Sequence, residues 1–200
     1  METERPKTLK IDAVITQLDA AALLLLKRFD CRPVHTLIFA SRQVLWDLHK
    51  FSPNPWITHV EGALEKRVKP EYRTLWRQRE KMVANFLKHA DRDRSDVLEG
   101  FDIQTINEMT FGVCVLALSF HVSLPERLAI GFSYVGFRAA GWLDFEGLCD
   151  DLGMNCERFA EYAKMNDFRR RELMLQAYES SLNQEAMKIK SAPFSLSPTF

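Results

Sequence analysis

The sequence has few of the residues that build disulfide scaffolds and tight turns. Its 200 residues include 4 cysteines, 8 glycines and 8 prolines. No two cysteines form a C-x-x-C pair, the close spacing that structural zinc sites and dithiol redox motifs use. Disulfide-stabilised proteins are usually smaller and denser in cysteine, so we expect free thiols and a reducing compartment, the cytoplasm.

An excess of charge of one sign is also lacking, because 27 basic and 27 acidic residues cancel to a net charge of +0. A protein that coats nucleic acid needs a basic face, so nucleic acid is not the expected partner. The longest apolar runs, Ala20–Leu26 and Phe111–Phe120, are shorter than the roughly 18–20 residues that span a bilayer. Residues 1–6 are polar and do not resemble a signal peptide. We therefore expect a soluble protein with no membrane partner.

Motifs of common cofactor and nucleotide sites are missing from the sequence. It contains no glycine-rich phosphate loop, no G-x-S-x-G nucleophile elbow and no H-E-x-x-H metal helix. No run of alternating polar and apolar residues predicts a strand. The sequence therefore predicts no cofactor and no β-sheet.

The chain is rich in helical periodicity and in residues for a sizeable core. Hydrophobic residues make up 46% of it and aromatic residues 11%. Apolar residues recur at spacings of three and four along most of the chain, as in amphipathic helices. The sequence predicts an all-α fold, an irregular bundle of six to eight helices. Helical segments are expected near residues 9–28, 33–50, 56–66, 70–90, 103–121, 125–138, 142–152, 155–164 and 167–188.

The chain is expected to form a main helical bundle over residues 1–140, a smaller helical region over 141–188 packed on it, and a mobile tail over 189–200. Leu23–Leu26 makes the end of the first helix apolar almost all round, which places it in the core or in a subunit interface. This cluster and the apolar Phe111–Phe120 helix favour a homodimer, with a large monomeric core as the alternative. We expect Gly131 and Gly136 to let a neighbouring helix approach closely.

The richest group of polar side chains lies where the helix ending near residue 90 stops. Lys81, Asn85 and His89 recur every four residues and so form one polar column. Histidine, with an unperturbed pKa of about 6.5, transfers protons near neutral pH, and an arginine such as Arg92 stabilises anions. The same residue types also cap helix C-termini with no chemical role, because cations interact favourably with the helix dipole. The predicted ligand-binding residues here are Lys81, Asn85, Lys88, His89, Asp91 and Asp93, with His89, Asn85 and Arg92 as catalytic candidates.

His35 is a further binding candidate, because it stands in the first turn of the second helix, where its ring is able to face the bundle. A single histidine in that position is more often hydrogen-bonded within the protein than bound to a ligand. His89, Asp91 and Asp93 form an H-x-D-x-D array to which His35 would add a nitrogen. Metal sites in helical bundles usually pair Glu-x-x-His motifs from facing helices, and no such motif is present, so no metal is predicted.

Residues 84–93, with the sequence Ala-Asn-Phe-Leu-Lys-His-Ala-Asp-Arg-Asp, resemble a run found in a group of small, uncharacterised bacterial helical proteins. Residues 19–27 and Pro33–Leu48 are similar to the first two helices of that group. The resemblance covers the first 140 residues or so and is specific around Asn85–Asp93. It implies a helical fold and no assigned activity.

A more distant resemblance is to HEPN domains, helical bundles that often dimerise and that include metal-independent RNases and toxins. Their motif is an arginine, four to six residues and a histidine, commonly with a polar residue just after the arginine. Asn85 and His89 match the polar residue and the histidine, and Ala84 stands in place of the arginine. The resemblance implies RNA as substrate, with His89 as general acid or base, Asn85 orienting the substrate, and Arg92 or Lys88 holding phosphate.

The sequence thus predicts a non-enzymatic, cytoplasmic binding or interaction protein of bacterial accessory-gene type, with a small molecule or a protein bound near Asn85 and His89. The alternative is a HEPN-like RNA-processing enzyme, for which nucleic acid would be the partner. The binding protein is favoured because the sequence contains no complete catalytic constellation.

Overall fold

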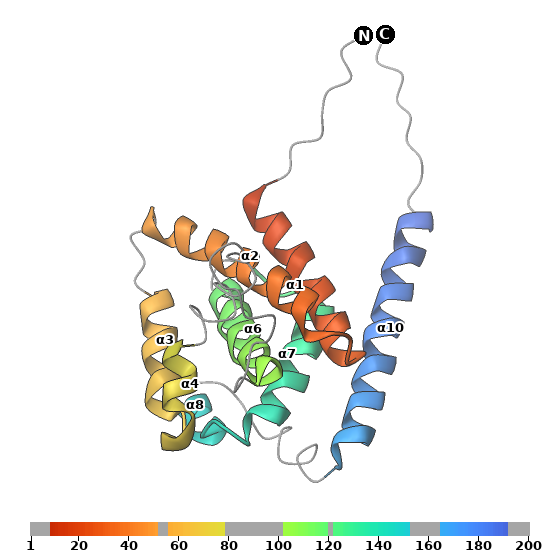
Figure 1. Cartoon of the computed structure of the whole chain (residues 1–200). Helices are drawn as coiled ribbons and strands as arrows, with labels where there is room; N and C mark the ends of the chain where they lie inside the picture. Colours follow the sequence, from red (N-terminus) through yellow and green to blue (C-terminus); the bar gives the residue numbers. More distant parts are fainter. Residues whose placement is uncertain (1–8, 52–55, 79–101, 120–121, 153–164, 192–200) are drawn as a thin grey trace, which may run out of the picture.

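The computed structural model describes residues 9–51, 56–78, 102–119, 122–152 and 165–191. These residues form eight α-helices and one 3₁₀ helix and contain no sheet, which confirms the predicted all-α bundle (Figure 1). Their one β-type contact is an isolated antiparallel bridge between Val68 and Leu143. None of the described helices is both long enough and apolar enough to cross a membrane.

The helix bounds follow the predicted segments closely. In chain order they are α1 (Lys10–Leu26), α2 (Cys31–Lys50), α3 (Trp56–Arg67), the 3₁₀ helix η1 (Pro70–Tyr72), α4 (Arg73–Gln78), α6 (Ile103–Ser119), α7 (Glu126–Ala139), α8 (Phe145–Leu152) and α10 (Asp167–Ser191). α2 begins two residues before the predicted start, because the Asp30 carboxylate accepts the backbone N–H of Arg32 and caps the helix.

Some predicted segments extend beyond the described residues. The helix expected over residues 70–90 is described as far as Gln78, and it opens as η1 before becoming α4. The helix expected over 155–164 lies outside the described residues, as does the expected tail from residue 192. Residues 189–191, which the sequence assigns to the tail, are the last residues of α10.

α6 is the central helix of the bundle and packs against α1, α2, α3, α4 and α7. Every residue of α6 from Thr105 to Leu118 is buried except Gly112, so the predicted burial of the apolar helix is confirmed over Phe111–Leu118. In α1, Leu25 and Leu26 lie in the core, while Leu23 and Leu24 pack against it. The leucine cluster therefore finds apolar contacts within a single chain.

Gly131 lies where α7 crosses α1. A Cβ atom at this position would come within 2.7 Å of the Ala22 Cβ and 3.4 Å of the Phe111 ring. Carbon atoms do not approach that closely, so the crossing requires glycine. The predicted close approach of a neighbouring helix is confirmed at Gly131.

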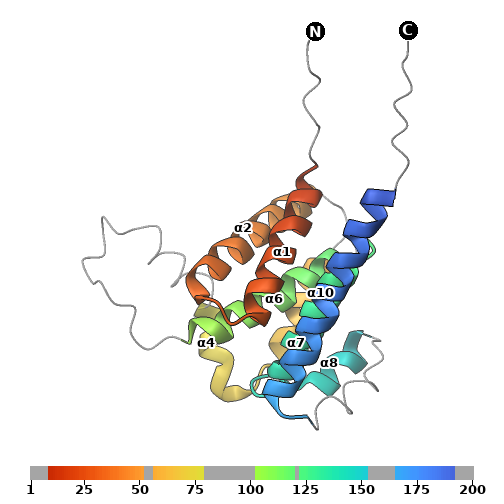
Figure 2. The ribbon, with the colours of Figure 1, turned by 90° about the vertical axis from the view of Figure 1, so that its right-hand side faces the viewer.

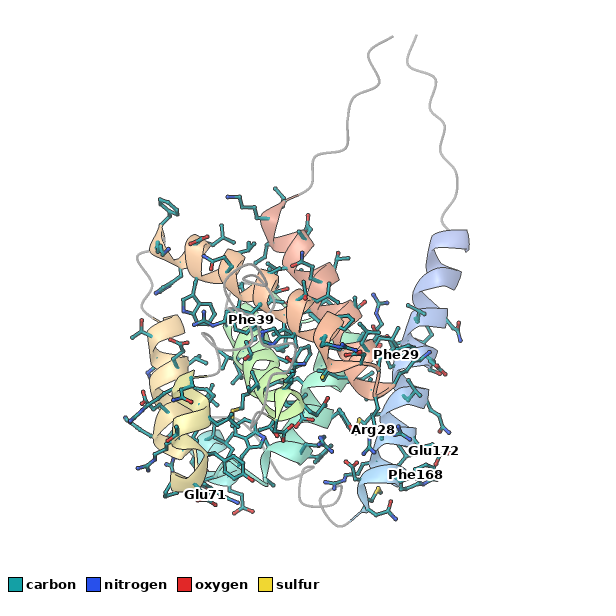
Figure 3. The ribbon with its side chains drawn as sticks, viewed as in Figure 1. Arg28, Phe29, Phe39, Glu71, Phe168 and Glu172 are labelled. Atoms are coloured by element: carbon teal, nitrogen blue, oxygen red, sulfur yellow. The ribbon has the colours of Figure 1, made fainter. Side chains whose placement is uncertain are left out.

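α1 ends in a Schellman motif whose left-handed residue is Arg28. The Phe29 N–H bonds the Leu24 carbonyl at 3.0 Å, and the Arg28 N–H bonds the Leu25 carbonyl at 3.1 Å. This position has a φ of 52° and is usually glycine, because a left-handed conformation costs other residues about 1–2 kcal/mol. Arg28 instead supplies a guanidinium that pairs with Asp167 at the start of α10. Figure 3 shows Arg28 near the lower part of α10, where Phe168 is labelled.

α10 crosses the face formed by α7 and α1 (Figure 2), and polar contacts fix it there. The Tyr178 hydroxyl donates to the Asp19 carboxylate at 2.7 Å, and Arg127 of α7 pairs with the same carboxylate at 2.8 Å. The Ser181 hydroxyl donates to Glu126 at 2.9 Å. α8 packs instead against α3, so the two described helices after residue 140 rest on different parts of the bundle.

The two helix glycines Gly131 and Gly62 provide a matched pair for measuring the α1–α7 crossing. We expect Gly131→Ala to lower the free energy of unfolding by about 1–3 kcal/mol, because the new methyl group overlaps Ala22. Gly62→Ala should raise the free energy of unfolding by up to about 1 kcal/mol, because alanine is the better helix former and no described atom lies within 4 Å of the added Cβ. Urea unfolding measures both values. Equal effects of the two substitutions would show that the crossing does not depend on Gly131.

The Asp19 carboxylate should contribute most to holding α10 on α1 and α7. Asp19→Ala removes the carboxylate that Arg127 and Tyr178 share, although the Asp19 backbone carbonyl, 2.9 Å from the Tyr178 hydroxyl, remains as an acceptor. Because the Asp19 side chain is 17% exposed and its loss leaves Arg127 without this ion pair, we expect a loss of about 2–4 kcal/mol. Tyr178→Phe deletes one hydrogen bond and should cost about 1 kcal/mol. Both values come from urea unfolding. A loss in Asp19→Ala no larger than that in Tyr178→Phe would contradict this role.

Candidate functional site

The polar stretch at the end of the predicted 70–90 helix lies outside the described residues. This applies to Lys81, Asn85, Lys88, His89, Asp91, Arg92 and Asp93. Their roles as binding or catalytic residues stay predictions. His35 is the one predicted site residue whose surroundings the structure describes.

His35 is buried between α2 and α6, with 1% of its surface exposed. Its Nδ1 lies 2.8 Å from the Asn107 Oδ1, and the Asn107 amide nitrogen donates to the Cys31 carbonyl at 2.7 Å. Because the amide nitrogen faces that carbonyl, Oδ1 is the atom that faces the ring, and Nδ1 carries the proton. The His35 ring also packs on Phe39, with ring centroids 4.2 Å apart. The pair joins the start of α2 to α6.

The tautomer leaves the His35 Nε2 as a buried lone pair. Nε2 has no hydrogen-bond partner among the described residues. Burial lowers the pKa of His35, and the bond to Asn107 opposes that shift. The ring is therefore held neutral inside the bundle, where it fixes the contact of two helices and is closed to solvent.

A second buried polar group, Glu108, follows Asn107 directly on α6 and is 1% exposed. Its Oε1 accepts the Arg138 Nε at 2.5 Å and the Gln104 amide at 2.8 Å. Burial raises the pKa of Glu108 against the opposing effect of Arg138. Arg138 also reaches Asp167 at 3.4 Å, so α6, α7 and α10 meet at one charge network. This network is an internal tie between helices.

The solvent-accessible site is a cleft between α3 and α8, at the lower left of Figure 1. The chain segments 67–69 and 142–144 run antiparallel there. The Lys69 N–H bonds the Trp142 carbonyl at 3.0 Å, and the Asp144 N–H bonds the Arg67 carbonyl at 2.9 Å. The Arg67 guanidinium then binds Asp151 through two nitrogens, at 2.8 and 2.9 Å, and Asp144 through the third, at 2.8 Å. The Arg67 bonds lower the pKa of Asp151, and the Gly147 N–H followed by Arg67 lowers the pKa of Asp144.

The cleft has a volume of about 390 Å³ and an excess of positive charge. Its lining residues are Lys66, Arg67, Val68, Lys69, Pro70, Arg73, Asp144 and Asp151. Both carboxylates are bound by Arg67, and the other three cations pair with no carboxylate among the described residues. Lys69 Nζ donates to the Ala140 and Gly141 carbonyls, and Arg73 Nε donates to the Val68 carbonyl. This arrangement is suited to binding an anion.

Sequence reasoning missed both Asn107 and the cleft. Asn107 and Glu108 are adjacent polar residues inside an apolar helix, and that was a readable signal of a buried polar contact. The cations of the cleft belong to a charged run over residues 65–73 that is typical of a solvated helix surface. Among the described residues, no three His, Cys, Asp or Glu side chains are placed to hold a metal ion.

The lowered pKa of His35 predicts that this residue makes the protein less stable in acid. The unfolded chain takes up a proton near pH 6.5 and the buried ring resists it, so stability present above pH 6.5 is lost as the pH falls below it. The slope from this one group is at most about 1.4 kcal/mol per pH unit. Glu108 acts in the opposite sense, because its raised pKa favours the folded state as the pH falls towards 4.5.

The contribution of His35 is therefore measured as a difference between variants. Urea unfolding at pH 7.5 and pH 5.5 should show a smaller loss of stability for His35→Gln than for the unmodified chain, with Glu108→Gln as the control for the opposing group. An unchanged loss in His35→Gln would mean that the ring is not held neutral.

Comparisons of sequence and of fold give no independent guide to the function. The chain matches no protein-family model, no curated protein and no solved structure. The resemblances at residues 84–93 therefore stay predictions. The cleft between α3 and α8 is the site from which a function is argued.

Proposed function

We propose that this is a non-enzymatic binding protein that takes an anionic ligand in the cleft between α3 and α8. The proposal is carried by one observation, that Lys66, Lys69 and Arg73 line a solvent-accessible hollow without a carboxylate partner among the described residues. Hydrogen bonds from charged donors to phosphate or carboxylate oxygens are about twice as strong as neutral ones. A small anion with several oxygens fits this group of donors.

Arg67 supports the proposal because it binds the two acidic side chains of the cleft, which would otherwise compete with an anionic ligand for the lysines and for Arg73. Its guanidinium binds both Asp144 and Asp151, so neither carboxylate forms an ion pair with the other three cations, and Asp151 acts on Lys66 only through a longer-range charge interaction. The bidentate contact to Asp151 also holds α8 against α3 in a fixed geometry. Donors held in place before binding lose less conformational freedom when a ligand arrives.

The described lining of the cleft favours binding over catalysis. It consists of cations, two occupied carboxylates, Val68 and Pro70, and it offers no hydroxyl or thiol nucleophile with an adjacent base. The HEPN-like alternative depends on Asn85, His89 and Arg92, which lie outside the described residues.

A cytoplasmic location and a homodimer are further parts of the proposal. Cys31 is a free thiol, which supports a reducing compartment. Phe51 and Phe168, 88% and 65% exposed, are large apolar side chains that a second copy would cover.

Charge reversal in the cleft tests anion binding. Titration calorimetry at low ionic strength with pyrophosphate should detect binding to the unmodified chain. Lys66→Glu combined with Arg73→Glu should weaken it at least tenfold, because two donors become repulsive, and added salt should weaken it as well. Lys10→Glu combined with Lys50→Glu changes the net charge equally on exposed positions of α1 and α2 and should have little effect. No binding to the unmodified chain, or equal losses in the two double variants, would refute the proposal.

A further inference from the structure

The cleft continues into a second hollow along the same helix. This neighbour has a volume of about 300 Å³ and is lined by Thr58, His59, Gly62, Ala63, Lys66 and Asp151. Lys66 and Asp151 line both hollows. The two hollows therefore adjoin, and we call the combined space the α3 groove. Its lining residues are those of the two hollows, which lie between Thr58 and Arg73 on one side and at Asp144 and Asp151 on the other.

Gly62 lies at the floor of the second hollow, in the middle of α3. Glycine inside a helix costs about 1 kcal/mol relative to alanine, so an interior glycine normally answers a packing need. Gly131 and Gly147 have such needs, because an added Cβ would meet Ala22 at 2.7 Å or the Arg67 guanidinium at 2.1 Å. Gly112 of α6 would make only an ordinary contact, 3.9 Å from the Val135 side chain, and Gly62 has no described atom within 4 Å of the added Cβ.

The open space over Gly62 suits a group that comes from outside the chain. Missing side chains allow a ligand or another backbone to approach a helix closely. A bulky residue here would fill part of the second hollow, which Gly62 lines. An occupant that extends along α3 from one hollow into the other would account for glycine at position 62.

The length of the groove indicates an extended occupant. Thr58 and Arg67 are nine residues apart on α3, which is about 14 Å at a rise of about 1.5 Å per residue. An extended peptide covers about 3.3 Å per residue, so four or five residues would lie along this part of the groove. A single phosphate would occupy one hollow.

The charges in the groove favour acidic side chains on that peptide. Lys66, Lys69 and Arg73 cluster at one end, where carboxylates would find charged donors. A nucleic acid strand is less suited, because the chain has a net charge of +0 and a strand of phosphates needs a broad basic face. We propose that the α3 groove binds an extended acidic segment of a partner protein, with the backbone of that segment crossing Gly62. This inference rests on the proposed function and adds the class of partner.

Three probes and three variants test the inference separately from anion binding. The probes are fluorescein-labelled hexaglutamate, pyrophosphate and a labelled single-stranded oligonucleotide of twelve nucleotides. Gly62→Leu fills the floor of the groove, Ala20→Leu adds a leucine at an exposed position of α1, and Lys66→Glu combined with Arg73→Glu removes the cations. Thermal unfolding checks the fold, and Gly62→Leu should not lower the melting temperature, because leucine is the better helix former.

We expect Gly62→Leu to weaken hexaglutamate binding at least tenfold and to change pyrophosphate binding less than twofold. Ala20→Leu should change neither affinity, and the double charge variant should weaken both. Unchanged hexaglutamate binding in Gly62→Leu would overturn the inference and leave the proposed function intact. Tighter binding of the oligonucleotide than of hexaglutamate would overturn it in favour of nucleic acid. Unchanged affinities in the double charge variant would overturn both the inference and the proposed function.

Discussion

The carboxylate of Glu108 is buried on α6, the helix that packs against α1, α2, α3, α4 and α7, and its hydrogen-bond donors come from α6 and α7. An isolated charge in such a place would cost several kcal/mol. Arg138 of α7 and Gln104 supply the hydrogen bonds, and Arg138 in turn contacts Asp167, which Arg28 also holds. One buried carboxylate thus connects α6 to α7 and, through Arg138 and Asp167, to the start of α10. The left-handed Arg28 belongs to the same chain of contacts, which explains why arginine stands at a position where glycine is easier to accommodate.

The helices themselves could be predicted because helical periodicity is a local signal. Each apolar stripe lies within one segment, and caps such as Asp30 and Asn166 act on residues two or three positions away. Gly131 was also readable, since an interior glycine in an otherwise regular helix indicates close approach. Residues 84–93 carry the most concentrated polar pattern in the sequence, and their role stays a prediction.

The candidate site could not be predicted, because its contacts join residues that are far apart in the sequence. His35 and Asn107 are 72 positions apart, and Arg67 is 77 and 84 positions from its two aspartates. No spacing rule encodes such pairs. Lys66, Lys69 and Arg73 belong to a charged run that is typical of a solvated helix surface. Only the fold shows that the two carboxylates near them, Asp144 and Asp151, are bound by Arg67. Gly62 is visible in the sequence as a glycine inside a predicted helix. Only the fold shows that no described atom lies within 4 Å of a Cβ added there.

The bridge at Val68 and Leu143 closes a long loop of chain that includes α6 and α7. Bringing two such distant segments together costs conformational entropy, and the cost grows slowly with loop length. The contacts that offset it include the packing of α8 on α3, two backbone hydrogen bonds, the Arg67 ion pairs and the Lys69 caps on α7. Because the same contacts form the wall of the α3 groove, the groove exists only while the loop is closed. A ligand bound there would contact residues on both sides of the bridge and so stabilise the closed loop. After its dissociation, the loop would be held closed only by contacts within the chain.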